Sequence, residues 1–355
     1  MSGAVQRLPL VDLLKAVAAQ LIVWHHLAFY GPLSDSAAPL WPESMAWLSQ
    51  QARIAVQVFL VVGGFLAARG LAPDGFWVPG RSLPVLLGQR YRRLAGPYVV
   101  ALLVAVAGSA LASRWMTHDS ISAPPTPAQL LAHVLLLHDL LGYEALSAGV
   151  WYVAIDFQLY ALLALLLWLG GRRRFAGLEL GVGFVTLLLL ASLFHFNLDP
   201  DWDVWAVYFF GAYGLGALAW WSARRGGRRP LAALVFLLAC IALAIDFRER
   251  ILVALGTALA LAIYQATGWG RHAPTRPLAA FLSRISYGVF LVHFPVCLVV
   301  NAAFSRFVSL TPELALLGMV LAWGLSLLAG ALFHAHVEQG FAGKARWRLS
   351  PSARA

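Results

Sequence analysis

The chain has 355 residues, of which 61% are hydrophobic and only 12% are charged, and its mean hydropathy is +0.75. Soluble domains carry about a quarter of their residues as charged side chains, so this composition excludes an ordinary soluble protein and predicts one that crosses a membrane several times. The formal net charge is +10, and its meaning depends on where the lysines and arginines lie.

Ten apolar segments have the length of about 17 to 25 residues that a membrane-spanning helix needs. We place them at 8–29, 53–71, 94–113, 150–169, 177–195, 204–222, 230–246, 251–268, 283–304 and 313–335. The shorter apolar piece 128–141 is expected to form an interfacial or re-entrant helix that does not cross. The predicted fold class is an all-α, polytopic membrane bundle of about ten transmembrane helices.

Lysine and arginine are unevenly distributed between the connecting loops. With the N-terminus inside, only five of the 26 fall outside, which leaves 26 − 5 = 21 on the cytoplasmic side. The five are Arg53, Arg114, Arg248, Arg250 and Arg306. This bias predicts cytoplasmic termini, with a membrane domain at 1–340 and a basic cytoplasmic tail at 341–355. It explains the net charge as a topology signal, so no nucleic-acid partner is expected.

The first span, "DLLKAVAAQLIVWHH", carries ionisable groups, which are costly inside a membrane and often functional there. Lys15 and His26 share one helix face within about 20° and lie about 16 Å apart along the axis, while His25 points about 100° away from His26. A functional polar stripe is one interpretation. The other is structural: Asp12 and Lys15 pair near the helix end, and the histidines bond to neighbouring helices.

The fourth span opens "VWYVAIDFQLY", in which Tyr152, Asp156 and Tyr160 share one helix face. Asp156 lies at about the predicted depth of His26, so the carboxylate is expected to orient the imidazole and stabilise its charged form. The alternative is that Asp156 only bonds tyrosine or tryptophan side chains.

Two further stretches carry candidate residues. "SRISYGVFLVHFPV" places Ser286 and His293 on one face of the ninth span, where His293 is equally well explained as a structural or as a functional group. "GQRYRRLAGPY" places Arg90 and Arg93 directly before the third span. Arginine forks suit phosphate, although a topology anchor or a lipid contact explains them as well. Cys240 and Cys297 have no metal or disulfide spacing, and no metal site is expected.

Together these motifs resemble the acyltransferase-3 family of integral membrane acyltransferases. The family's first helix carries a basic residue, ten residues and a histidine, matched by Lys15 and His26. "FLVVGGFL" is similar to its second motif, with Gly63 in place of serine, and Arg90 and Arg93 match its paired arginines. The remaining matches are Asp156 in place of glutamate, Gln158, Tyr160, the "ISYGVFLVHFPV" segment and Glu338 in the closing "HAHVEQGF".

The resemblance implies an enzyme that transfers an acyl group, commonly acetyl from acetyl-CoA or another acyl-CoA, to a hydroxyl of a saccharide or other envelope molecule. It implies a multi-pass protein of the bacterial inner membrane with no permanently bound cofactor. Lys15, Arg90 and Arg93 would hold the donor's nucleotide. His26 would deprotonate the acceptor or carry the acyl group briefly, and Asp156 would set its tautomer. The other candidates bind substrate or have structural roles: Asp12, Tyr152, Gln158, Tyr160, Ser286, His293 and Glu338.

Two other functions compete with acyl transfer. A proton-coupled transporter would also place charged residues inside the membrane, but it predicts pseudo-symmetric halves, and the sequence contains no internal repeat. A structural scaffold leaves the polar stripe of the first span unexplained. We therefore expect a membrane acyltransferase whose acceptor the sequence does not name.

Overall fold

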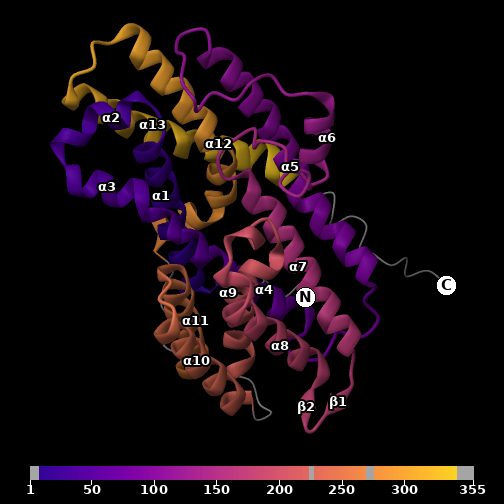
Figure 1. Ribbon diagram of the computed structural model, residues 1–355. Helices are drawn as coiled ribbons and strands as arrows, with labels where there is room; N and C mark the ends of the chain where they lie inside the picture. The colour runs from indigo at the N-terminus through magenta and orange to yellow at the C-terminus, as the bar shows by residue number, and fades with distance from the viewer. Residues whose placement is uncertain (1–7, 224–227, 269–275, 342–355) are drawn as a thin grey trace. The chain divides into compact units, whose positions relative to one another are not determined.

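The computed structural model describes residues 8–223, 228–268 and 276–341 and is built almost entirely of helices (Figure 1). The short helices are α2 (Pro32–Ala37), α3 (Pro42–Gln50) and α6 (Pro127–Val134). The long ones are α1 (Pro9–Phe29), α4 (Val56–Leu71), α5 (Leu83–Ala112), α7 (Val150–Gly170), α8 (Leu180–Phe194), α9 (Ala206–Ser222), α10 (Arg228–Ile245), α11 (Glu249–Thr267), α12 (Pro277–Phe307) and α13 (Pro312–Phe333).

Short 3-10 turns occur at Ala38–Leu40, Ala52–Ala55, Phe196–Leu198 and Pro200–Trp202, and a π-helical turn, His334–Glu338, follows α13. The predicted basic tail, apart from Phe341, lies outside the described residues.

The predicted membrane bundle is confirmed in its main features. Among the described residues, eight helical segments are long and apolar enough to span a bilayer, and they correspond to eight of the ten predicted spans. The other two predicted spans correspond to α9, with 17 residues, and α10, with 18. The piece 128–141 is not a spanning helix, because α6 has only eight residues, about 12 Å of helix.

The structure corrects the sequence prediction at two boundaries. Helix α5 begins at Leu83, so Arg90 and Arg93 lie within it and not before it. Between α7 and α8 the chain forms a small antiparallel hairpin of β1 (Arg174–Phe175) and β2 (Leu178–Glu179). Its turn residues Ala176 and Gly177 both have positive φ, 48° and 82°. This backbone is that of a tight two-residue hairpin, and hydropathy alone does not reveal it.

Two compact units divide the chain. The first consists of Met1–Ala18, Ile54–Leu87 and Ile155–Ser283, and the second of Ala19–Arg53, Gly88–Ala154 and Arg284–Ala355. One boundary falls in the 3-10 turn Ala52–Ala55, and the other four fall inside α1, α5, α7 and α12, so each of these helices contributes to both units.

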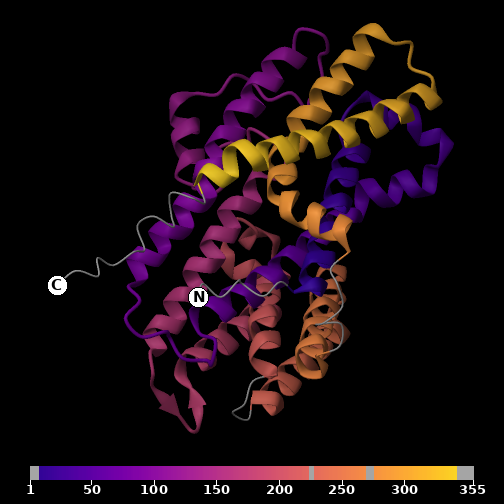
Figure 2. The same cartoon turned by 180° about the vertical axis from the view of Figure 1, so that it is seen from behind.

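The core of the first unit is built around α9, which packs against α4, α8, α10 and α11 (Figures 1 and 2). Glycines let α9 and α4 approach closely. A Cβ at Gly64 would lie 1.8 Å from the carbonyl oxygen of Tyr213, and one at Gly216 would lie 1.9 Å from that of Val61. Small residues at such crossings allow the backbone contact that drives helix association in membranes.

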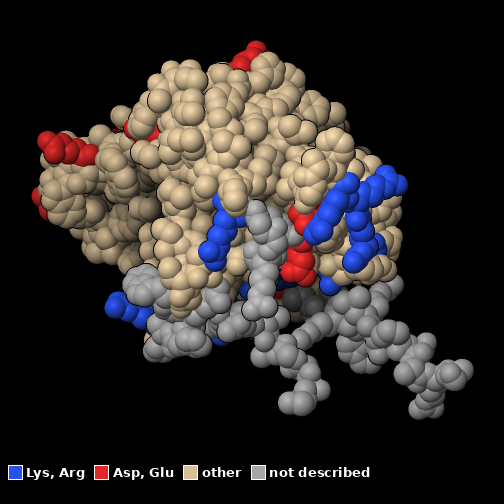
Figure 3. All heavy atoms as spheres, turned by 90° about the horizontal axis from the view of Figure 1, so that it is seen from below, with Lys and Arg blue, Asp and Glu red and all other residues tan. Residues whose placement is uncertain are grey.

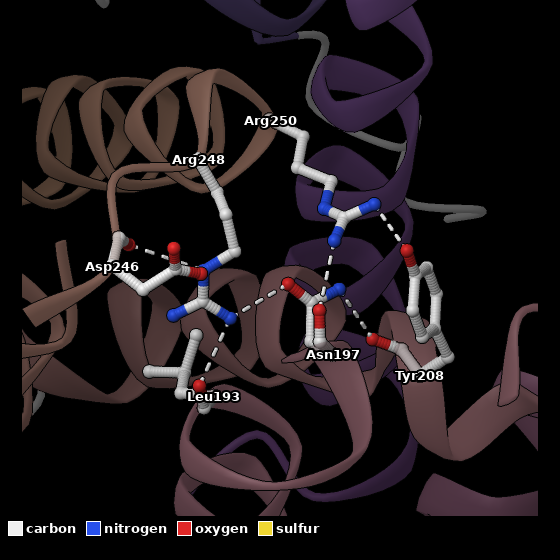
Figure 4. A network of polar contacts seen from close by, with 6 residues as sticks. All are labelled: Leu193, Asn197, Tyr208, Asp246, Arg248 and Arg250. Carbon is white, nitrogen blue, oxygen red and sulfur yellow. Dashed lines mark hydrogen bonds and ion pairs between the residues drawn. The ribbon is translucent and has the colours of Figure 1, made fainter. Parts of the chain in front are cut away.

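A polar network joins the turn between α10 and α11 to the end of α8 (Figure 4). Arg248 donates from Nη1 to the oxygens Leu193 O and Asn197 Oδ1, both at 3.0 Å, and pairs with Asp246. Arg250 donates to Asn197 O at 2.8 Å and to the hydroxyl of Tyr208. Backbone carbonyls that the end of α8 leaves unpaired are thereby satisfied by guanidinium groups.

The second unit contains the C-terminal part of α1, the short helices α2, α3 and α6, most of α5 and of α12, and α13. Helix α13 packs against α2 (Figure 1). Asn301 of α12 accepts a hydrogen bond from Leu33 N at 3.1 Å and donates to Cys297 O at 3.0 Å. Ala112, Leu298 and Ala302 form a buried cluster between α5 and α12.

Charged side chains are unevenly distributed on the surface. On the face that Figure 3 shows, lysine and arginine side chains gather beside acidic ones, and most of the remaining described surface there is uncharged.

In the first unit, the guanidinium carbons of Arg172 and Arg174 lie 5.6 and 5.0 Å from the centre of the Phe76 ring. Arg174 also pairs with the buried Glu179 at 2.9 Å. These contacts fix the β1–β2 hairpin to the loop after α4.

Candidate functional site

A pair of buried histidines lies within the second unit. His26 of α1 and His293 of α12 are 8% and 0% exposed, and His26 Nδ1 lies 2.6 Å from His293 Nε2. The two rings are nearly parallel, at 4°, with their centroids 4.9 Å apart. The contact therefore joins the edges of two roughly coplanar rings and is a short hydrogen bond between imidazoles.

Backbone carbonyls assign the proton positions in this pair. His293 Nδ1 lies 2.9 Å from both Val289 O and Phe290 O, which only accept, so Nδ1 carries a proton. In a neutral ring His293 Nε2 is then an acceptor, and the hydrogen between the rings belongs to His26 Nδ1. His26 Nε2 is left with a lone pair, which is the form that a general base requires.

Aromatic side chains and one glycine surround the two rings. Tyr30 and Phe294 lie 5.6 and 6.3 Å from the His26 ring, between centroids. Tyr152 packs on Phe290 at 5.3 Å. A Cβ at Gly149 would lie 3.1 Å from Phe290 and 3.9 Å from His26 Cε1, the carbon between the two ring nitrogens. With φ of 83°, Gly149 also has a conformation that favours glycine.

His25 has a different partner from His26. Its Nδ1 lies 3.0 Å from Leu48 O, at the end of α3, and its ring packs against Phe29. The neighbouring histidine thus fixes α1 to α3 within the second unit. The face of α1 between Lys15 and His26 is covered by protein, because Ala19 and Ile22 are both buried.

Asp12 and Lys15 meet α12 in the first unit. Ser283 Oγ donates to Asp12 Oδ1 at 2.8 Å, and Lys15 Nζ donates to Ser283 O at 3.2 Å. Both candidate residues thus bond to the buried Ser283, Asp12 through the serine side chain and Lys15 through its backbone carbonyl. Binding of a donor nucleotide by Lys15 stays a prediction.

Asp156 is buried in the first unit. A Cβ at Gly63 would lie 3.7 Å from Asp156 Oδ1 and 3.0 Å from the Tyr213 ring, so the glycine of this motif leaves room beside the carboxylate. Gln158 Oε1 accepts from Ala206 N at 3.2 Å and caps the start of α9. Asp156 and His26 belong to different units, and their pairing stays a prediction.

The remaining motif residues occupy defined positions. Ser286 is buried on α12, and Tyr160 is half-buried on α7. Glu338 accepts from His334 Nδ1 at 3.1 Å, and its Oε1 would lie 2.7 Å from a Cβ at Gly288. The absence of a side chain at Gly288 of α12 therefore leaves room for the Glu338 carboxylate.

Arg90 and Arg93 lie on the first turns of α5, half-buried and exposed respectively. Between them, Tyr91 donates its hydroxyl hydrogen to Val134 O at 2.6 Å and so links α5 to the end of α6. The two guanidinium groups are on the same helix, three residues apart, and neighbour each other on its surface.

A second pair of histidines, in the segment after α5, is not among the residues predicted from the sequence. His133 and His138 are buried and stacked, with ring centroids 4.1 Å apart. His133 Nδ1 donates to Gln129 O at 2.8 Å, and its Nε2 accepts from Leu146 N at 3.2 Å. Only a neutral ring makes both bonds. Burial lowers the pKa of each histidine to about 4.

Within the described residues, no group of three histidine, cysteine, aspartate or glutamate side chains is placed to hold a metal ion.

The comparison with protein families gives one match: residues 9–333 match the family described as acyltransferase domain, the acyltransferase-3 family that the motifs resemble. No curated protein and no solved structure matches the chain.

Proposed function

Because this match covers nearly the whole chain, the protein belongs to the acyltransferase-3 family, and we propose that it moves an acyl group from cytoplasmic acyl-CoA to a hydroxyl of an envelope acceptor. The acyl group is acetyl in the simplest case, and the acceptor is a saccharide or another envelope-linked molecule. The observation that carries the proposal is the hydrogen bond from His26 Nδ1 to His293 Nε2, since it leaves a lone pair on His26 Nε2.

In the proposed reaction His26 acts as general base and then as general acid. Its Nε2 takes the proton of the acceptor hydroxyl while the oxygen forms a bond to the acyl carbonyl carbon. The carbon–sulfur bond then breaks, and the CoA sulfur takes the proton back from Nε2. The products are an ester and free CoA. His293 holds the ring in the required tautomer throughout.

The charged candidates receive two further roles in this proposal. Arg90 and Arg93 bind the donor's phosphates, because planar guanidinium groups bind oxyanions through two hydrogen bonds, and Lys15 is a further candidate for the same anion. Asp156 stabilises the imidazolium of His26. Asp156→Asn should accordingly lower turnover, but less than His26→Ala, because the amide loses only the charge that stabilises the imidazolium while His293 still holds the ring.

The direct test uses purified protein in nanodiscs, acetyl-CoA labelled in its acetyl group, and envelope glycans from a bacterium. We expect label on the glycan as an alkali-labile ester, with free CoA released in equal amount. A protein that only transports acetyl-CoA releases no free thiol and leaves the label on CoA, and that result would contradict the proposal. The bacterial inner membrane is the proposed location.

A further inference from the structure

The segment between α5 and α7 returns along α5 instead of staying at its end. Helix α5 ends at Ala112, yet Val134, at the end of α6, accepts a hydrogen bond from Tyr91, about 30 Å back along the helix. The segment then continues to Gly149, which lies against His26 and Phe290. One stretch of chain thus connects the surroundings of Arg90 with those of the catalytic candidate.

Contacts between α5 and α12 show how far along α5 the arginines and the histidine pair are separated. The Tyr287 hydroxyl donates to Leu94 O at 3.0 Å, and a Cβ at Gly108 would lie 3.0 Å from Pro295 Cβ. His293, two residues before Pro295, is therefore level with the third quarter of α5. Arg90 lies one turn before Leu94, so about 20 Å of helix separates the arginines from the histidine pair.

Polar atoms without partners occur between these two ends. Across the part of the chain that the structure describes, the hydroxyl groups of Tyr98 and Ser147 and both ring nitrogens of His138 are buried and have no hydrogen-bond partner. Tyr98 and His138 are 0% exposed, and Ser147 is 4% exposed. Buried polar atoms are nearly always bonded, so such a group indicates an occupant that supplies the missing partners.

These side chains are connected through short contacts. His138 stacks on His133, and His133 Nε2 accepts from the backbone of Leu146, the residue next to Ser147. Asp139 lies 3.4 Å from His138 Nε2. Tyr98 is two turns after Tyr91 on about the same face of α5, and Tyr91 bonds to Val134, four residues before His138. The unpartnered atoms therefore follow one another from the middle of α5 towards Gly149.

We infer that Tyr98, His138 and Ser147 bind the pantetheine arm of acyl-CoA. This arm carries two amide groups and a hydroxyl, which need hydrogen-bond partners in an otherwise apolar protein interior. With the phosphates at Arg90 and Arg93, the arm runs along α5 and the segment 127–149 and delivers the thioester to His26. The inference rests on the proposed function and adds to it the course of the donor.

The test compares two ligands that differ only in the arm. Binding of radiolabelled CoA and of 3′-phospho-ADP, which lacks pantetheine, is measured on protein in nanodiscs for wild type, Tyr98→Phe and Ser147→Ala. Each variant removes one hydroxyl, so CoA should bind about three- to tenfold more weakly. The affinity for 3′-phospho-ADP should stay within about twofold of wild type, since that ligand does not reach these residues.

The matched control is Tyr264→Phe, which removes a buried tyrosine hydroxyl in the first unit and should leave both affinities unchanged. Unfolding midpoints of all variants show that the proteins are folded. If both variants keep full CoA affinity, or lose affinity for both ligands equally, the arm does not bind these residues and the inference is wrong. If wild type binds 3′-phospho-ADP but gains nothing from the arm, the inference again fails while the phosphate site stands. If it binds neither ligand, the proposed donor is wrong as well.

Discussion

At the scale of single residues, two adjacent histidines have different surroundings. His26 bonds to another imidazole, His293, whereas His25 bonds to a backbone carbonyl, Leu48 O. A general base contributes about 10²- to 10⁴-fold to a rate. His26→Ala should therefore reduce turnover by about that factor, and His25→Ala should keep most activity. Turnover is measured in membranes at matched protein amounts. An inactive His25→Ala beside an active His26→Ala would contradict the assignment.

His293 is predicted to act through His26 and not on substrate. Replacement by alanine removes the acceptor for His26 Nδ1–H, so the imidazole loses its fixed tautomer. We expect His293→Ala to lower kcat by about 10²-fold with little change in KM. His293→Gln should recover much of the loss, because its side-chain oxygen accepts the same hydrogen bond. Equal losses in the two variants would show that the imidazole itself takes part or that the site has collapsed.

Arg90 and Arg93 are proposed to bind the phosphates of the donor. A hydrogen bond to a charged group contributes about 1.5–3 kcal/mol, so either Arg→Ala variant should raise the KM for acyl-CoA by about ten- to a hundredfold. The KM for the acceptor should change little. Arg92, exposed on the same turn of α5, is the matched control. Normal donor saturation in both variants would identify these arginines as topology anchors.

At the scale of elements, the segment 127–149 depends on neutral histidines. Unfolded, His133 and His138 take up protons near pH 6.5, whereas in the folded protein burial holds the pKa of each at about 4. Between these pH values the unfolded state binds more protons, so acidification favours unfolding. Protonation of His133 also turns Nε2 into a donor facing Leu146 N.

The unfolding midpoint should therefore fall as the pH is lowered from about 6.5 to about 4, beyond the general acid effect on other groups. His138→Phe keeps an aromatic ring on His133 and removes one of the two titrating groups, so its midpoint should depend less steeply on pH. Scanning calorimetry or intrinsic fluorescence in detergent checks this. Identical pH profiles for the variant and wild type would contradict a neutral, buried His138.

Elements differ in how far the sequence predicts them. Long apolar runs give nearly every spanning helix, and the short length of 128–141 correctly excludes a crossing. Hydropathy does not reveal the early start of α5, because "LGQRYRRL" is polar and contains Gly88, although it has no proline and continues the helix. The β1–β2 hairpin depends on positive φ at Ala176, which alanine rarely adopts, so no local pattern announces it.

At the scale of the whole molecule, the site residues come from distant parts of the chain. His26 and His293 are 267 positions apart, and periodicity only says which face each occupies. Their hydrogen bond depends on how α1 packs against α12 in the second unit. The sequence likewise does not predict the unpartnered atoms of Tyr98, His138 and Ser147, because burial without a hydrogen-bond partner is a property of the folded chain. The order of the motifs indicates the family, whereas tertiary packing determines which side chains meet.

In the proposed reaction the acyl group passes from a donor on one side of the membrane to an acceptor on the other, with His26 as the general base. The most direct measurement uses proteoliposomes of known protein orientation. Labelled acetyl-CoA is enclosed on the side of the protein's cytoplasmic face, and glycan acceptor is present only on the opposite side. Wild-type protein should label the glycan, and His26→Ala should do so at least a hundredfold more slowly. Equal labelling by the two proteins, or labelling only when donor and acceptor share a side, would contradict the account.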